Sequence, residues 1–283
     1  MWWWRKRRFL ELERYKEIER SIITTYRKEI WAKFIQGIQE FNMVQEGDRI
    51  AVCISGGKDS ALLAKCFQEL KRHRKMNFEL VFLVMDPGYS ELNRQKIIKN
   101  SEILNIPITI FDTTIFDSVE RIEDHPCYIC ARMRRGYLYE KAKELGCNKI
   151  ALGHHFNDVI ETVLMGMIYG AQMQTMMPKL HSTSHPGMEL IRPLYFVKED
   201  DIIKWGKNNG LDFLKCACKI TEISGTTDQN GSKRQEVKKL IASLKEIYDN
   251  VDINIMRSTY NVNLDTIISY YKGDEKHHFL DDF

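Results

Sequence analysis

Short apolar runs alternate with helix-like stretches between residues 49 and 170, and this alternation limits the possible folds more than any other feature of the chain. Strands are predicted at residues 49–54, 78–85, 108–111 and 149–152, and helices near residues 58–73, 90–104, 128–145 and 156–170. Such alternation is typical of a parallel sheet with helices on both faces and right-handed crossovers. We therefore expect an α/β protein with a Rossmann-like parallel sheet.

The segments on either side of this region are less regular. Apolar residues such as Ile18, Ile22 and Ile30 recur at helical spacing, so residues 1–41 are predicted to form a helical N-terminal extension. After residue 170, the pattern predicts these elements in turn: a strand within residues 188–196, a helix at 198–209, a polar loop at 221–232 and a helix at 233–248. A length of 283 residues allows one large domain or two small ones.

The charge balance alone excludes little. The chain has 42 basic and 39 acidic residues, and a net charge of +3 is too small to indicate a polyanionic partner, so local clusters must carry any argument for nucleic acid. No apolar run of about 18 residues predicts a transmembrane helix. Charged residues follow the start MWWWRKRRF, where a signal peptide needs an apolar run. We expect a cytoplasmic protein with no membrane association.

The string SGGKDS, residues 55–60, stands between a predicted strand and a predicted helix. Gly56 and Gly57 would let the backbone approach a ligand closely, and the first N–H groups of the helix would face it. The hydroxyls of Ser55 and Ser60 and the charge of Lys58 would add to such a site. The turn therefore predicts a phosphate site. The alternative is an ordinary surface turn with Asp59 near the helix start.

A second polar turn, GHHFND, follows the predicted strand at residues 149–152. Gly153 allows the bend, and Asp158 either caps the next helix or faces the phosphate pocket, where it would hold Mg²⁺ or assist proton transfer. His154 and His155 are adjacent, so at most one of them is expected to face the site.

The cysteines fall into close pairs and isolated residues. Cys127 and Cys130 have C-x-x-C spacing, whereas Cys216 and Cys218 have C-x-C spacing. Three thiolates of this set could hold an iron–sulfur cluster, but the spacing is equally compatible with zinc or with no metal. The remaining three cysteines are interpreted as structural: Cys53, Cys66 and Cys147.

Basic and aromatic clusters are candidates for RNA contact. Arg132, Arg134 and Arg135 follow the second cysteine, and they either form a solvated helix face or bind a nucleic-acid backbone or a negatively charged transition state. Further basic clusters lie at Arg5–Arg8 and at residues 71–75. The tryptophans at residues 2–4 would stack on bases or pack against a partner subunit.

Three blocks of the sequence, in order, carry a family resemblance. SGGKDS resembles the PP-loop of N-type ATP pyrophosphatases, and together with CYICARMRRG…GHHFND and IRPLYF it resembles the tRNA 2-thiocytidine synthetase family, from about residue 30 to about residue 245. The resemblance implies an adenine nucleotide alpha hydrolase-like fold, ATP, Mg²⁺ and a [4Fe–4S] cluster. The predicted domains are a helical N-terminal extension at 1–41, a PP-loop catalytic domain at 42–220 and a C-terminal helical segment with a tail at 221–283.

The resemblance also assigns roles to single residues. The phosphates of ATP would lie on Ser55, Gly56, Gly57, Lys58, Asp59 and Ser60, with the main chain of Met85 near the adenine and Gly153 beside the nucleotide. Lys58, Asp158 and Arg134 match the positions of catalytic residues in this and related families. Cys127 and Cys130 match two cluster ligands. The third is predicted to be Cys218, with Cys216 as the alternative because the family has C-x-x-C at this place.

The implied reaction adenylates the C2 oxygen of a tRNA cytidine, at position 32 in the family, and then replaces it with sulfur. A persulfide carrier or sulfide would donate the sulfur, and the resemblance favours a homodimer. Alternatives are another PP-loop tRNA-modifying enzyme, of the 2-thiouridine or lysidine type, and a non-catalytic zinc-dependent RNA-binding protein. The tail YYKGDEKHHFLDDF departs from the family pattern. It is interpreted as a docking or disordered end, with a metal role for His277 and His278 as a minor alternative.

Overall fold

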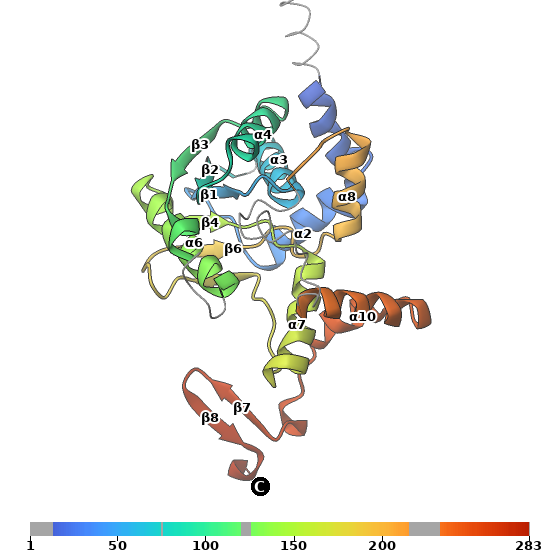
Figure 1. Cartoon of the computed structure of the whole chain (residues 1–283). Helices are drawn as coiled ribbons and strands as arrows, with labels where there is room; N and C mark the ends of the chain where they lie inside the picture. Colours follow the sequence, from blue (N-terminus) through green and yellow to red (C-terminus); the bar gives the residue numbers. More distant parts are fainter. Residues whose placement is uncertain (1–13, 75, 120–125, 215–232, 283) are drawn as a thin grey trace, which may run out of the picture. The chain divides into compact units, whose positions relative to one another are not determined.

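A six-stranded sheet lies at the centre of the chain's first compact unit (Figure 1). The computed structural model describes residues 14–74, 76–119, 126–214 and 233–282. The sheet has the order β3-β2-β1-β4-β6-β5 and consists of β1 (Arg49–Ile54), β2 (Glu79–Asp86), β3 (Ile108–Asp112), β4 (Lys149–Ala151), β5 (Lys179–His181) and β6 (Glu189–Ile191). Strands from β3 to β6 run parallel, and only the edge strand β5 is antiparallel to its neighbour β6. The carboxyl ends of β1, β2 and β4 therefore meet at one edge, where open parallel sheets bind ligands.

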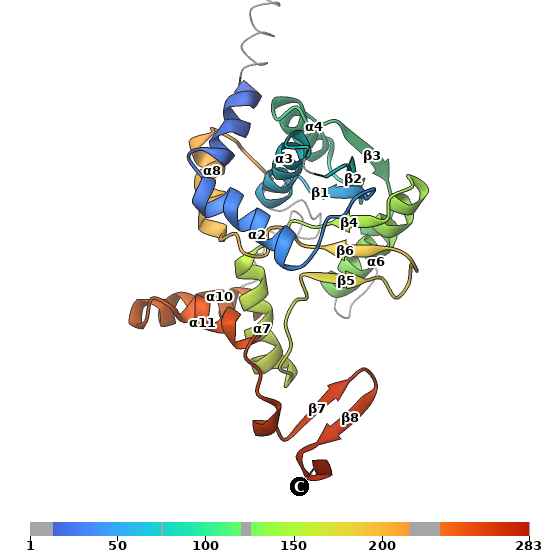
Figure 2. The same ribbon diagram turned by 180° about the vertical axis from the view of Figure 1, so that it is seen from behind.

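Helices cover both faces of this sheet, as Figures 1 and 2 show from opposite sides. Alternation along β1 sends Ile50, Val52 and Ile54 into one apolar cluster, whereas Ala51 and Cys53 join another. The first cluster contains side chains of α2 (Ala32–Glu40), α3 (Lys58–Arg72), α4 (Glu91–Ile103) and α8 (Glu199–Asn208). The second contains side chains of α6 (Pro126–Glu144), and a short helix, α5 (Ile115–Val119), precedes it in the chain. These two layers confirm the predicted Rossmann-like class.

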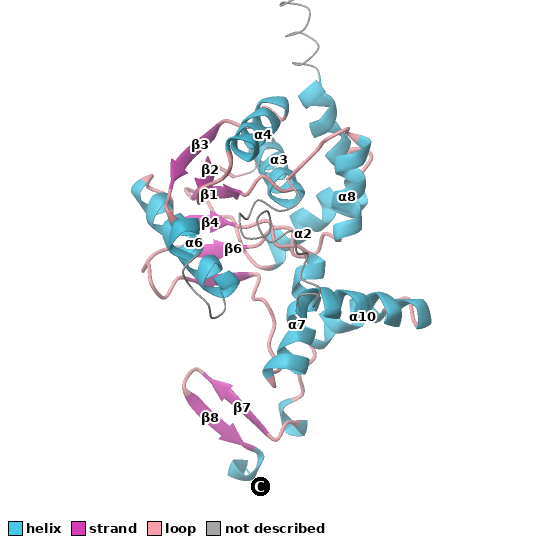
Figure 3. Ribbon diagram, viewed as in Figure 1, coloured by secondary structure: helices cyan, strands magenta, loops and turns pink. Residues whose placement is uncertain are grey.

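Most predicted elements between residues 49 and 170 agree with the structure to within two residues, and Figure 3 shows the alternation of helix and strand. The predicted strand within residues 188–196 is much shorter, because β6 ends at Ile191. Pro193 follows almost at once, and proline has no N–H to continue a strand ladder. The edge strand β5 and helix α5 were not expected.

The N-terminal extension is helical in its described part, as predicted, but the helix is interrupted. A helix over residues 14–23 ends in a turn, and a π-helix, η1 (Arg27–Trp31), then leads into α2. The hydroxyl of Ser21 donates to the Ile18 carbonyl (2.6 Å) and that of Thr24 to the Arg20 carbonyl (2.7 Å). Such side-chain bonds to the backbone compete with regular helix at this point.

A buried ion pair attaches the extension to the sheet layer. The ammonium of Lys65 on α3 is fully buried and contacts the carboxylate of Glu19. It also donates to the Leu104 carbonyl and to Gln68 Oε1, both at 2.7 Å. All three N–H groups of the Lys65 ammonium therefore have acceptors inside the fold, and one of these acceptors is Glu19. The pair holds the N-terminal helix against α3.

A second compact unit consists of Val159–Met176 and the described residues after Gly231. It contains most of α7 (Phe156–Gly170), and then α10 (Lys233–Ile247), α11 (Val251–Ser258), η2 (Leu264–Thr266), β7 (Ser269–Lys272), β8 (Glu275–His278) and η3 (Phe279–Asp282). Strands β7 and β8 form an antiparallel hairpin, so the interpretation of the tail as disordered is wrong, while docking stays a prediction. The predicted boundary at residue 221 assigned α7 to the catalytic domain, whereas the contacts group most of it with this unit.

Within the second unit, α7 and α10 are joined by polar contacts. The Tyr169 hydroxyl donates to Glu236 at 2.5 Å, and Arg234 lies 3.4 Å from Glu161. In the part of the chain that the structure describes, no helix combines the length and apolar character needed to cross a bilayer.

Candidate functional site

The glycine-rich turn links the end of β1 to the start of α3. Gly56 has φ +84°, and a Cβ there would lie 2.8 Å from side-chain atoms of both Ile97 and Leu214, so the position needs glycine for conformation and for space. The Ser55 N–H donates to Ser60 Oγ (3.2 Å), and the Ser60 hydroxyl donates to the Gly57 carbonyl (3.0 Å). These bonds hold the turn against the N-terminus of a 15-residue helix, which is suited to an anion.

The second polar turn packs directly on the first. A Cβ on Gly153 would lie 3.0 Å from the Ser60 nitrogen and 3.1 Å from the Asp59 carbonyl carbon. Because these are backbone atoms that cannot swing aside, only glycine allows the two turns to meet. Gly153 thus brings the GHHFND turn against the first turn of α3.

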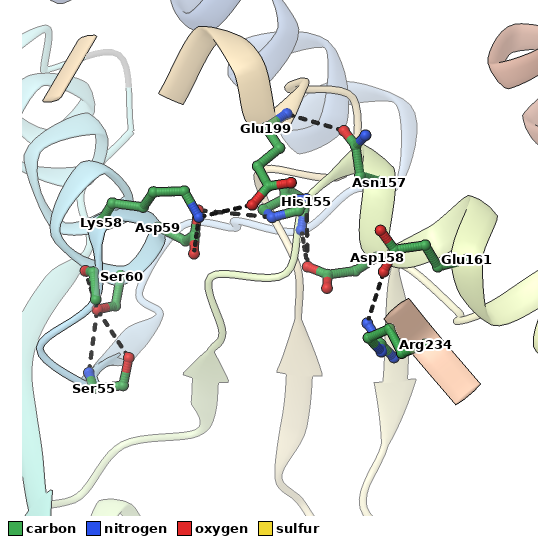
Figure 4. Close-up of polar contacts among 11 residues, drawn as sticks. Ser55, Lys58, Asp59, Ser60, His155, Asn157, Asp158, Glu161, Glu199 and Arg234 are labelled. Carbon is green, nitrogen blue, oxygen red and sulfur yellow. Dashed lines mark hydrogen bonds and ion pairs between the residues drawn. The ribbon is translucent and has the colours of Figure 1, made fainter. Parts of the chain in front are cut away.

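A histidine lies between the acidic residues of the two turns (Figure 4). His155 is buried, with Nε2 3.7 Å from Asp59 and Nδ1 3.4 Å from Asp158. Asp158 also accepts from the His155 N–H at 3.0 Å, which is the capping contact expected at the start of α7. Burial raises the pKa of Asp59, and the nearby Asp158 adds to this rise against the opposing effects of His155 and Lys58.

Lys58 lies between two carboxylates rather than in open solvent. Its Nζ is 3.2 Å from Asp59 and 3.1 Å from Glu199 at the start of α8 (Figure 4). Burial lowers the pKa of Lys58, but the two carboxylates outweigh it, so the pKa is raised and the ammonium keeps its charge. Sequence reasoning did not identify Glu199, which is 141 residues away in the chain; only the acidic start of a predicted helix marked the region.

One cavity joins the glycine-rich turn to the cysteine helix. Its volume is about 710 Å³, and its lining includes Ser55, Lys58, Glu199, Tyr89, Cys130 and Arg134. The first two come from the turn after β1, and Cys130 and Arg134 lie four residues apart on α6, which places them on one helix face. The nucleotide-type turn and the second cysteine therefore line the same space.

Arg134 and the other two arginines of its cluster have different environments. Arg134 is half-buried on the cavity wall, where its Nη2 lies 3.5 Å from the Tyr89 hydroxyl, whereas Arg132 and Arg135 are exposed. Burial raises the pKa of Tyr89, so its hydroxyl stays protonated beside the guanidinium.

The turn after β2 positions Tyr89, which sequence reasoning missed. Asp86 is buried, and its carboxylate accepts from the N–H groups of Gly88 (2.9 Å) and Tyr89 (2.7 Å) and pairs with Arg94. Asp86 therefore organises the turn after β2. Met85 is buried beside Ile115 at the same strand end.

The predicted metal ligands are only partly within the described residues. Cys127 lies in the first turn of α6, three residues before Cys130, while Cys216 and Cys218 lie outside the described residues. The last described residue before them, Leu214, donates its N–H to the Gly56 carbonyl at 3.1 Å. Among the described side chains, no group of three or more His, Cys, Asp or Glu residues is arranged to hold a metal, so the ligand set stays a prediction.

The isolated cysteines have the structural role expected of them. Burial raises the pKa of the Cys53 thiol to about 12, and burial likewise raises the pKa of Cys66 and of Cys147. All three side chains are buried, which favours a neutral thiol over a thiolate; at Cys147 this effect outweighs the opposing effect of Arg49.

Comparison with known proteins agrees with this geometry. The family model described as a PP-loop domain matches residues 28–218. A tRNA-cytidine(32) 2-sulfurtransferase from Neisseria meningitidis serogroup C is 40% identical over 185 residues, which are 63% of this chain and 57% of the relative. One from Syntrophotalea carbinolica is 37% identical over 227 residues, covering 79% of this chain and 83% of the relative. The chain thus spans little more than half the length of the Neisseria protein.

A solved structure shows the same fold. The U34-tRNA thiolase NcsA from Methanococcus maripaludis, determined with its [4Fe–4S] cluster, superposes with a TM-score of 0.63 at 21% identity, covering 88% of this chain and 78% of that one. On the strength of the matched PP-loop domain and the Syntrophotalea relative, the chain belongs to the PP-loop family and, within it, to the family of the tRNA-cytidine(32) 2-sulfurtransferases.

Proposed function

We propose that the protein catalyses ATP-dependent thiolation of tRNA, replacing the C2 oxygen of a cytidine, at position 32 as in the names of its relatives, with sulfur. The observation that carries this proposal is that the Ser55–Asp59 turn and Cys130 line the same cavity. A two-step reaction on one base needs its nucleotide site and its sulfur site within reach of the same atom.

In the first step, the C2 oxygen of the base attacks the α-phosphorus of ATP, and the bond to pyrophosphate breaks. The pyrophosphate group would lie on the N-terminus of α3, where Ser55, Gly57 and Ser60 line the turn. Lys58 and Arg134, both on the cavity wall, would stabilise the charge that develops on the phosphates. Mg²⁺ entering with ATP would neutralise further charge, with Asp158 as the candidate carboxylate.

We propose that an iron–sulfur cluster is held by cysteines beside this cavity. Cys130 lines the cavity, and Cys127 precedes it by three residues on α6. The third donor would come from Cys218 or Cys216, which follow Leu214 by four and two residues and so lie at most about 14 and 7 Å along the chain from it. Bound to three cysteines, a [4Fe–4S] cluster would keep one iron without a protein ligand and so offer a place for the sulfide that displaces AMP from C2.

Transfer RNA is the proposed partner, and its target base must leave its stack to enter the cavity. Basic surface is supplied by exposed Arg132 and Arg135, on the same helix α6 as Cys130, and by exposed Lys71 and Arg74, on and after α3. Binding should weaken steeply with salt. We further propose a cytoplasmic homodimer that takes sulfur from a persulfide carrier or from sulfide, with residues 42–220 as the catalytic domain.

Mass spectrometry of tRNA nucleosides from cells that lack the gene tests this function. We expect 2-thiocytidine to disappear and to return when wild-type protein is supplied, but not when Lys58→Ala is supplied. Unchanged 2-thiocytidine in the deletion strain would exclude the proposed substrate. If the deletion strain instead lacked another modified nucleoside, the protein would catalyse a different PP-loop tRNA-modifying reaction.

A further inference from the structure

A carboxylate on helix α8 contacts the lysine of the glycine-rich turn. Glu199, the first residue of α8, places Oε1 3.1 Å from Lys58 Nζ. The two side chains are only 15% and 26% exposed, and both line the cavity that contains Ser55 and Cys130. The ion pair is therefore a contact of the site and not of the outer surface.

Glu199 is itself held by the second polar turn. Its backbone N–H donates to Asn157 Oδ1 at 3.0 Å (Figure 4). Helix α8 is anchored on the core through Ile202 and Trp205, both fully buried. A lysine has a long flexible side chain, and here its end contacts the carboxylate of a residue whose backbone is held by Asn157 and by the packing of α8.

An incidental ion pair would look different. Pairs between two exposed side chains contribute little, because solvent screens them and both side chains lose freedom. The two side chains of the Lys58–Glu199 pair are largely shielded from solvent, and the backbone of its acidic member is held in place before any ligand enters. Such preorganisation lowers the cost of placing a charge next to a bound phosphate.

We propose that Glu199 is a positioning residue that fixes the Lys58 ammonium at the cavity wall, where it meets the phosphates of the nucleotide. The inference rests on the proposed function, because it takes ATP as the ligand of this turn. The raised pKa of Lys58, which the two carboxylates cause against the effect of burial, agrees with a lysine kept charged for this task.

A double-mutant cycle with an ATP analogue tests the inference. Calorimetry would measure the affinity of the full-length protein for α,β-methylene ATP with Mg²⁺, for the wild type, Glu199→Gln, Lys58→Ala and the double variant. Asp200→Asn is the matched control. Asp200 is exposed, and its substitution removes one negative charge from the same turn of α8 as Glu199→Gln does. Thermal unfolding of each variant confirms that it is folded.

We expect Glu199→Gln to weaken binding roughly tenfold, as befits the loss of one charge-assisted contact, and Asp200→Asn to change it less than about twofold. In the Lys58→Ala background, Glu199→Gln should have no further effect, because its partner is gone. A purely structural role for Glu199 would instead leave its effect unchanged in that background.

Two further outcomes would also overturn the inference. If Glu199→Gln bound the analogue as the wild type does, or more tightly, while Lys58→Ala bound weakly, Glu199 would not position Lys58 although the nucleotide site would stand. If the wild type bound no analogue, or if Lys58→Ala bound as well as the wild type, the proposed nucleotide site would fail and the inference with it.

Discussion

At the scale of single residues, close backbone packing matters as much as charge. Gly56 and Gly153 are required by what surrounds them: Ile97 and Leu214 in one case and the backbone of residues 59 and 60 in the other. The motif SGGKDS predicted the first of these from sequence. Contacts such as those of Glu199 and Tyr89 could not be predicted in the same way, because they join residues far apart in the chain and their residue types are common.

The packing at Gly153 leads to a first prediction. Gly153→Ala would push a methyl group against the backbone of α3, so we expect it to cost about 1–3 kcal/mol of unfolding free energy and to weaken ATP binding. In Gly136→Ala, the added methyl would have no heavy atom within 4 Å, and alanine favours helix, so a gain of about 0.5–1 kcal/mol is expected. Urea denaturation measures both. Equal stability of the two variants would show that the turns do not pack as described.

The environment of Asp59 leads to a second prediction, on pH. Burial raises the pKa of Asp59, so the folded protein binds this proton more tightly than the unfolded chain does. Stability therefore falls as the pH rises from the ordinary range of an aspartate through the raised pKa, and the loss is complete above it. Asp59→Asn should be more stable than the wild type at neutral pH while losing activity. Urea denaturation of both proteins at neutral and at acidic pH measures this difference in unfolding free energy. The prediction is wrong if Asp59→Asn is not more stable than the wild type at neutral pH, or if its advantage does not shrink at acidic pH.

At the scale of elements, the sequence pattern predicted the helices and strands of the first unit well because their apolar runs are buried: β1 on both faces and α3 over most of its length. Helix α3 begins and ends within one residue of its predicted limits. Periodicity failed where a local contact replaces regular structure, as at Ser21 and Thr24 in the extension. It also failed for the β7–β8 hairpin, whose short polar strands Ser269–Lys272 and Glu275–His278 carry no apolar alternation.

The attachment of the N-terminal helix to α3 leads to a third prediction. Lys65→Met would remove the fully buried partner of Glu19 and leave it only the more exposed Arg72, so we expect a loss of about 3 kcal/mol of unfolding free energy. The double variant Lys65→Met, Glu19→Leu should recover much of it, since an apolar pair fills the same space without a buried charge. Lys71→Met, on the exposed side of the same helix, should change stability by less than about 0.5 kcal/mol. Equal effects at positions 65 and 71 in urea denaturation would be incompatible with the buried pair.

At the scale of the whole molecule, the two units differ in their surfaces. Among the described residues, most of the large apolar side chains that are well exposed belong to the second unit, for example Ile247 at 84%, Ile268 at 73% and Leu280 at 58%. An isolated two-stranded hairpin such as β7–β8 is marginally stable by itself. These features support the proposed homodimer, with the second unit as the contact surface.

The fourth prediction concerns this assembly. Light scattering should find a dimer for the wild type and a monomer for the double variant Ile268→Glu, Leu280→Glu, because two charges would be desolvated in the interface. Leu92→Glu in the first unit, at a site that is 84% exposed, should leave the dimer intact. A wild-type monomer at micromolar concentration would exclude the homodimer, and a dimer in all three proteins would exclude this surface.

The central claim is that one cavity holds both the nucleotide turn and the sulfur-bearing helix, and separating the two reaction steps tests it most directly. Anaerobically prepared protein would be given ATP and unmodified tRNA, with pyrophosphate release and 2-thiocytidine measured in the same sample. We predict that Lys58→Ala loses both products, whereas Cys130→Ser still releases pyrophosphate but forms no 2-thiocytidine. Undiminished 2-thiocytidine formation by Cys130→Ser would contradict the account.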